Sequence, residues 1–173
     1  MKIESTKFSL EDLNGFLDAY VDRERQILAG RLERASERLK ALAPRVQPER
    51  SDHDEWTAHE LLAHIAVLSK FYGVLVHRIA SGQRASMDIM EAVQLRDAVG
   101  HQMSQLEPAD LLRMTIADHE RTIETLRTAA PADLRRVGDL GEGVTMTAED
   151  IARLPLVSHL ELHLDQLEKL LGS

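Results

Sequence analysis

The sequence contains no cysteine. This absence excludes disulfide bonds, thiolate nucleophiles and cysteine-ligated zinc, so any metal ion must be bound by histidine, aspartate or glutamate. Basic residues are also in the minority, because 21 Lys and Arg stand against 29 Asp and Glu and give a formal charge of −8. An acidic chain does not offer the broad positive surface that binds nucleic acid, so we expect no nucleic-acid partner.

Long apolar runs are missing as well. The N-terminal stretch MKIESTKFSLEDL lacks the apolar core of a signal peptide, and no segment reaches the roughly 20 apolar residues of a membrane span. We therefore expect a cytoplasmic protein with no membrane partner. A chain of 173 residues can bury a substantial core and is usually one domain, so we expect a single domain over residues 1–173.

Helix signals recur along the chain, whereas strand signals are nearly absent. Caps, prolines and apolar spacing predict helices over residues 10–42, 58–79, 108–129 and from 148 onward, with a weaker helical segment over 87–103. Capping boxes that begin at Ser9, Thr57 and Thr147 fix the starts of three of these helices. The glycine-containing segment 130–146 is predicted to be a loop, where it could line the mouth of an active site. Pro155 is expected to kink the last helix or to delay its start.

Three of the eight histidines, which lie on the apolar faces of the second and last helices, together suggest a metal site. His64 points inward from the second helix, and His159 and His163 share a face of the last helix because an α-helix turns about 100° per residue. Burying an unpaired imidazole costs about 1–3 kcal/mol, so three inward histidines need partners. A shared divalent ion would partner all three and leave a coordination position open for chemistry. The predicted ligands are therefore His64, His159 and His163.

The remaining histidines receive other interpretations. His59 and His77 fall on the opposite side of the second helix and are predicted to face water. His119 lies on the apolar face of its own helix, where it is either a fourth ligand or, as we favour, a core or ligand-supporting histidine. His53 and His101 are given no role. The alternative for the three inward histidines is a set of ordinary hydrogen bonds in the core, since a single inward histidine is more often satisfied by a carbonyl or carboxylate.

Two stretches of the sequence resemble the DinB/YfiT-like family. The run WTAHELLAH, residues 56–64, is similar to a signature in which a tryptophan and a capping residue open the second helix and a ligand histidine follows. The run HLELHLDQL, residues 159–167, is similar to the closing motif, a histidine pair followed by glutamine and an apolar residue. The resemblance implies an all-α four-helix bundle with long crossovers, a divalent metal bound by three histidines, and a homodimer. Pro155 departs from the family pattern, so the site requires a regular helix again by Ser158.

The ligand set indicates what chemistry such a site supports. Three neutral imidazoles leave a divalent ion with its full charge, which lowers the pKa of a bound water or thiol. Zinc and nickel suit this set best, and iron(II) is compatible with it. The resemblance implies a transferase that activates a low-molecular-weight thiol of the bacillithiol or mycothiol class toward a small-molecule substrate.

Two alternatives to this transferase remain open. The first is metal-assisted hydrolysis, with water in place of thiol. The second is a non-catalytic, stress-associated interaction protein with a structural metal and a leucine-rich dimer surface. No obvious general base lies beside the histidines, because Glu161 and Asp165 project elsewhere on the helix, and no catalytic residue is assigned.

Overall fold

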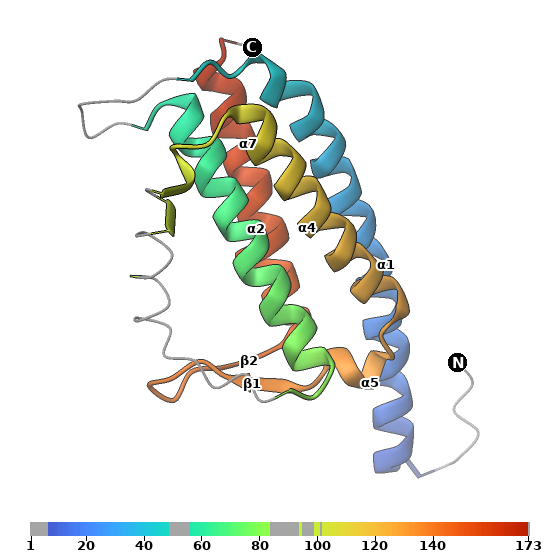
Figure 1. The fold of residues 1–173 in the computed structure, drawn as a ribbon. Coiled ribbons are helices and arrows are strands. Elements are labelled where there is room, and N and C mark those ends of the chain that lie inside the picture. Colours follow the sequence, from blue (N-terminus) through green and yellow to red (C-terminus); the bar gives the residue numbers. More distant parts are fainter. Residues whose placement is uncertain (1–6, 49–55, 84–93, 95–98, 101, 173) are drawn as a thin grey trace.

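The computed structural model is a helical bundle built around four long helices in the described part of the chain (Figure 1). It describes residues 7–48, 56–83, 94, 99–100 and 102–172. The long helices are α1 (Leu10–Leu42), α2 (Ala58–Ala80), α4 (Pro108–Thr128) and α7 (His159–Leu170). The shorter elements are η1 (Ala43–Arg45), α5 (Pro131–Leu134), β1 (Val137–Asp139), β2 (Thr145–Thr147), α6 (Ala148–Ile151) and η2 (Ala152–Ser158). The helical fold class is confirmed. The long crossovers stay a prediction, and most of segment 87–103 lies outside the described residues.

Three helices begin at the capping boxes that the sequence predicts. The side chains of Ser9, Thr57 and Thr147 each accept a hydrogen bond from the backbone N–H three residues later, at the starts of α1, α2 and α6. The carboxylate at that third position accepts in return from the backbone N–H of the cap. Each box satisfies two backbone donors that a helix start would otherwise leave unpaired, which fixes where the helix begins.

Helix α2 is the central core helix. By length and composition it is the one helix among the described residues that could cross a membrane, but 72% of its most apolar window is buried inside the bundle. That burial is what a core helix requires. Gly73 lets α4 approach closely, because a Cβ at this position would lie 2.5 Å from Oγ1 of Thr122. The close approach helps fix the position of α2, which carries His64.

The segment predicted as a loop over 130–146 is partly ordered secondary structure, so that prediction is wrong in detail. It contains α5 and an antiparallel hairpin in which Gly138 of β1 pairs with Met146 of β2. Gly141 and Gly143 adopt positive φ angles of 83° and 78° in the connecting turn, where glycine has no steric penalty. Leu140 is buried, so the hairpin is anchored on the bundle.

Pro155 lies in a π-helical turn, η2, that links α6 to α7. The backbone N–H of His159 donates to the carbonyl of Leu154, five residues earlier, as well as to that of Leu156. This wider turn accommodates a residue that has no backbone N–H and whose ring clashes with the preceding turn of an α-helix. The expected interruption is confirmed, and the regular α-helix resumes at His159, one residue later than the Ser158 that the sequence analysis required. The resumed helix still includes both His159 and His163.

The first turns of α1 leave apolar side chains exposed, among them Leu10, Phe16 and Tyr20. Farther along the same helix, Leu28 and Leu32 are fully buried in the bundle. The apolar spacing of α1 therefore predicts its helical form but not uniform burial. The homodimer implied by the family resemblance stays a prediction.

Candidate metal centre

Helices α2 and α7 bring His64, His159 and His163 together. One potential ligand atom from each ring lies within 4.8 Å of those of the other two. The Nε2 atoms of His159 and His163 are 2.8 Å apart, and the ring centroids of His64 and His163 are 4.8 Å apart. His163 is buried, whereas His64 and His159 are half-buried, so the cluster lies at the edge of the core. This edge position leaves room for a ligand to approach.

Gln166 sets the orientation of His163. The amide Oε1 of Gln166 lies 2.7 Å from Nδ1 of His163. An amide oxygen can only accept, so Nδ1 carries the proton and donates it, and the lone pair of Nε2 faces His159. A metal ion would take the place of the proton shared between the two Nε2 atoms. The closing motif in the sequence includes this glutamine, but the motif alone assigns it no contact. Its spacing of three residues from His163 is the signal that could have predicted the hydrogen bond.

Trp56 forms one wall of the cluster. Its ring centroid lies 4.4 Å from that of His64 and 6.2 Å from that of His163. The indole is 48% exposed, so it covers the histidines on one side and meets solvent on the other. Trp56 comes directly before the Thr57 cap, and the fixed start of α2 holds it beside His64. The sequence pattern included this residue, but helical spacing could not place a side chain that precedes the helix.

The acidic residues next to the histidine pair turn away from the cluster, as predicted. Oε2 of Glu161 forms an ion pair with Nη2 of Arg31 at 2.6 Å, and Oδ1 of Asp165 forms one with Nη2 of Arg38 at 2.7 Å. Both carboxylates are therefore tied to α1 rather than to the histidines. Among the described residues, the candidate ligands in this cluster are imidazoles alone, a donor set that suits zinc, nickel or iron(II).

Comparison with known families agrees with this arrangement. A sequence model described as the DinB superfamily matches residues 20–167. The chain belongs to the DinB superfamily. Neither the curated proteins nor the solved structures contain a match to it. For a member of this metal-binding superfamily, the convergence of three histidines is compatible with a divalent metal ion.

His119 of this DinB protein lies in the core and is satisfied by two serines. Its Nδ1 is 2.8 Å from Oγ of Ser36, and its Nε2 is 2.9 Å from Oγ of Ser69. The Ser36 hydroxyl donates to the carbonyl of Leu32, so it must accept from Nδ1–H, and Nε2 accepts from Ser69. Burial lowers the pKa of His119 to about 4. The favoured prediction of a core histidine is confirmed, and the alternative of a fourth ligand finds no support.

His59 and His77, the two histidines predicted to face water from α2, differ in exposure. His59 was predicted to face water, but it is buried, and its Nε2 donates to the carbonyl of Leu106 at 2.8 Å. The chain just before α4 covers this side of α2, which an analysis of one helix cannot anticipate. His77 is exposed, as predicted. His53 and His101 lie outside the described residues.

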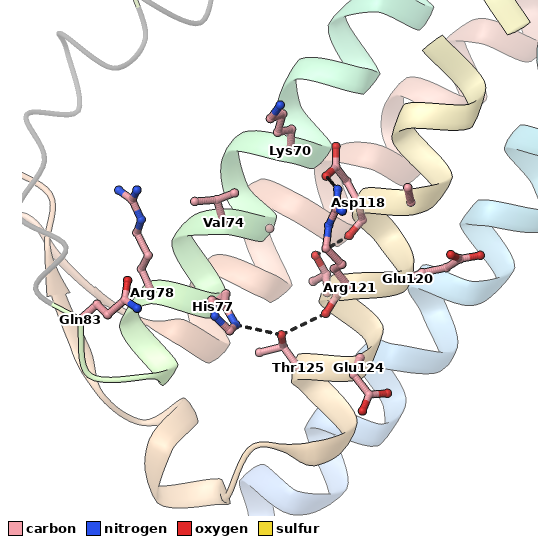
Figure 2. A pocket seen from close by; sticks show the side chains of 13 residues that line it. Lys70, Val74, His77, Arg78, Gln83, Asp118, Glu120, Arg121, Glu124 and Thr125 are labelled. Carbon is pink, nitrogen blue, oxygen red and sulfur yellow. Dashed lines mark hydrogen bonds and ion pairs between the residues drawn. The ribbon is translucent and has the colours of Figure 1, made fainter. Parts of the chain in front are cut away.

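A cleft of about 680 Å³ between α2 and α4 is separate from the histidine cluster (Figure 2). His77 lines it and lies 3.4 Å from Oγ1 of Thr125, while Arg121 pairs with Asp118 (Figure 2). Its lining carries charges of both signs, and none of the three clustered histidines lines it. This cleft therefore plays no part in the candidate metal centre.

Proposed function

We propose that this DinB-superfamily protein is a metal-dependent transferase that activates a low-molecular-weight thiol at His64, His159 and His163. The observation that carries the proposal is the convergence of three imidazoles whose ligand atoms lie within 4.8 Å of one another. Three neutral ligands leave a coordination position for a substrate atom, as in catalytic rather than structural metal sites. The thiol class rests on the family resemblance of the two histidine motifs.

A divalent ion held by these histidines would lower the pKa of a bound thiol and so supply a thiolate near neutral pH. The protein's own residues would prepare this site. Gln166 keeps the lone pair of His163 directed into the cluster, and Trp56 covers the ring of His64. Arg31 and Arg38 hold the neighbouring carboxylates away from the imidazoles, so no negative ligand reduces the charge at the site.

The proposed transfer is a nucleophilic substitution that needs no oxidant or reductant. The thiolate sulfur forms a bond to an electrophilic carbon of the acceptor, and the leaving group departs from that carbon with its electron pair. The thiol proton passes to solvent. With 1-chloro-2,4-dinitrobenzene as a test acceptor, the new bond is carbon–sulfur and the group that leaves is chloride.

The test is thiol transfer by tag-free protein loaded with zinc or nickel, using bacillithiol or mycothiol and this acceptor. We expect turnover by the wild type and by His77→Ala, whose histidine is exposed and outside the cluster. His64→Ala should lose turnover while keeping its helical circular dichroism. Equal turnover by His64→Ala would contradict the proposal, and so would failure of the metal-loaded wild type with both thiols.

A parallel assay distinguishes a hydrolase from a thiol transferase. An activated ester such as 4-nitrophenyl acetate is supplied with the metal-loaded protein in the absence of thiol. Metal-dependent hydrolysis that exceeds every thiol transfer rate would replace the transferase by a hydrolase. A bound metal ion with neither activity would favour the interaction protein instead.

A further inference from the structure

A second pocket adjoins the histidine cluster at His159. It has a volume of about 340 Å³. Its walls include Phe71 and Tyr72 from α2, Leu140 and Met146 from the β1–β2 hairpin region, and Leu154 from η2. His159 lines the pocket too, so the pocket and the candidate metal centre share one residue.

Two parts of the chain that the sequence marks as irregular line this pocket: the segment 130–146, predicted as a loop, and the helix interruption predicted at Pro155. The hairpin lies beside the C-terminal end of α2 (Figure 1). The backbone N–H of Leu140 donates to the carbonyl of Val144 at 2.9 Å, which closes the hairpin turn. The π-helical turn contributes Leu154 and Pro155 to the wall, about one turn before His159 in the chain. A loop segment and a helix break thus become parts of one apolar cavity.

The chemistry of the walls selects the ligand. No charged side chain lines the pocket among the described residues, and its polar side-chain groups are the phenol of Tyr72 and the imidazole of His159. In the metal-free protein, a carboxylate or ammonium group would lose hydration there without gaining an ion pair, which is unfavourable. An apolar group gains about 25 cal/mol for each Å² that it buries. The volume lies near the lower end of the usual range for small-molecule sites, roughly 300–1,000 Å³, and suits one aromatic ring or a short aliphatic chain.

We infer that this pocket binds the uncharged, apolar part of the acceptor substrate and presents its reacting end at the His159 side of the cluster. The role as acceptor site rests on the proposed transferase function. The preference for an uncharged apolar ligand rests on the pocket alone. Leu154, Met146 and Leu140 are then the residues that determine specificity.

The test compares methyl benzoate with benzoate, which share a ring and differ in charge. Binding is followed in metal-free protein by NMR of the methionine methyl groups, with the Met146 signal assigned from Met146→Leu. We expect methyl benzoate to shift the Met146 signal and benzoate to bind at least tenfold more weakly. Metal-free protein is used so that direct coordination of benzoate by an ion cannot mimic pocket binding.

Leu154 offers a variant with a matched control. Its side chain is 56% exposed, and that of Leu162 on α7, which does not line the pocket, is 53% exposed. Leu154→Asp should weaken methyl benzoate binding at least tenfold, whereas Leu162→Asp should leave it within twofold of the wild type. Leu154→Trp, which keeps the wall apolar but narrows the cavity, should also weaken binding, and thermal unfolding by circular dichroism checks that each variant is folded.

Three results would overturn the inference: equal binding of the two ligands, no binding of methyl benzoate, or equal effects of the Leu154 and Leu162 variants. Failure of the pocket is distinguishable from failure of the proposed function. If the wild type binds methyl benzoate but does not transfer a thiol, only the proposed transferase function is contradicted. If the wild type transfers a thiol but does not bind methyl benzoate, only the acceptor pocket is contradicted.

Discussion

His119 and the cluster of His64, His159 and His163 both lie in the helical bundle, but their ring nitrogens have different partners. His119 is buried, and two serine hydroxyls occupy its two ring nitrogens. In the cluster, one nitrogen of His163 is held by Gln166 and the other faces the Nε2 of His159. Hydroxyl partners from α1 and α2 make His119 a structural residue, whereas imidazoles that face one another form a potential ligand set.

Solvent access separates the two regions as well. His119 lies in the interior between α1, α2 and α4, because Ser36 and Ser69 contact it from the two other helices. His64 and His159 are half-buried and reachable from the surface. In this protein, converging nitrogens at an accessible edge distinguish the candidate metal centre from the buried His119. The following predictions test each side of this contrast.

The largest effect is expected from His119 when the pH is lowered. Its folded pKa of about 4 lies below the ordinary histidine value of 6.5, so the unfolded chain binds more protons between these values. Stability from this group is intact above about pH 6.5 and is lost as the pH falls toward 4, by about 3 kcal/mol in the free energy of unfolding. Urea unfolding of metal-free protein at pH 7 and pH 4 measures this loss.

The variant His119→Gln isolates the contribution of His119 from that of the other histidines. Glutamine can hydrogen-bond to Ser36 and Ser69 but does not titrate, so the pH dependence should flatten by most of this amount. His77→Gln changes an exposed histidine and should leave the pH dependence as in the wild type. An unchanged pH dependence in His119→Gln would contradict the role of burial in lowering the pKa.

A smaller effect is expected from Gln166, on metal affinity rather than stability. Gln166→Leu removes the acceptor for Nδ1–H of His163 and should weaken zinc binding by about 10- to 100-fold. Gln166→Glu keeps an acceptor and should retain affinity within about tenfold of the wild type. Calorimetric titration with zinc measures both variants. Equal affinity in Gln166→Leu and wild type would show that the amide does not position the histidine.

Local sequence patterns predicted much of this molecule. The three capping boxes mark real helix starts, and the four-residue spacing of His159 and His163 places both on one side of α7. Helical periodicity also placed His64 facing inward. These predictions succeed because capping and helical spacing depend on residues within one or two turns of each other.

Features that depend on distant contacts were missed. His59 is buried because the chain near Leu106 covers it, which no property of α2 alone encodes. The strands of the β1–β2 hairpin are three residues long and glycine-containing, so their sequence resembles a loop until Leu140 is buried against the bundle. Pro155 indicates an interruption of the helix, but the sequence does not indicate that the interruption takes the form of a π-helical turn.

The proposed metal centre requires that three imidazoles from two helices bind one divalent ion. Calorimetric titration of tag-free, metal-free protein with zinc measures this binding, with His163→Ala and the exposed-site control His77→Ala studied beside the wild type. We expect one zinc per chain for the wild type and His77→Ala, with affinity at least a hundredfold lower in a folded His163→Ala variant. Stoichiometric zinc binding by His163→Ala with wild-type affinity would contradict the proposed metal centre.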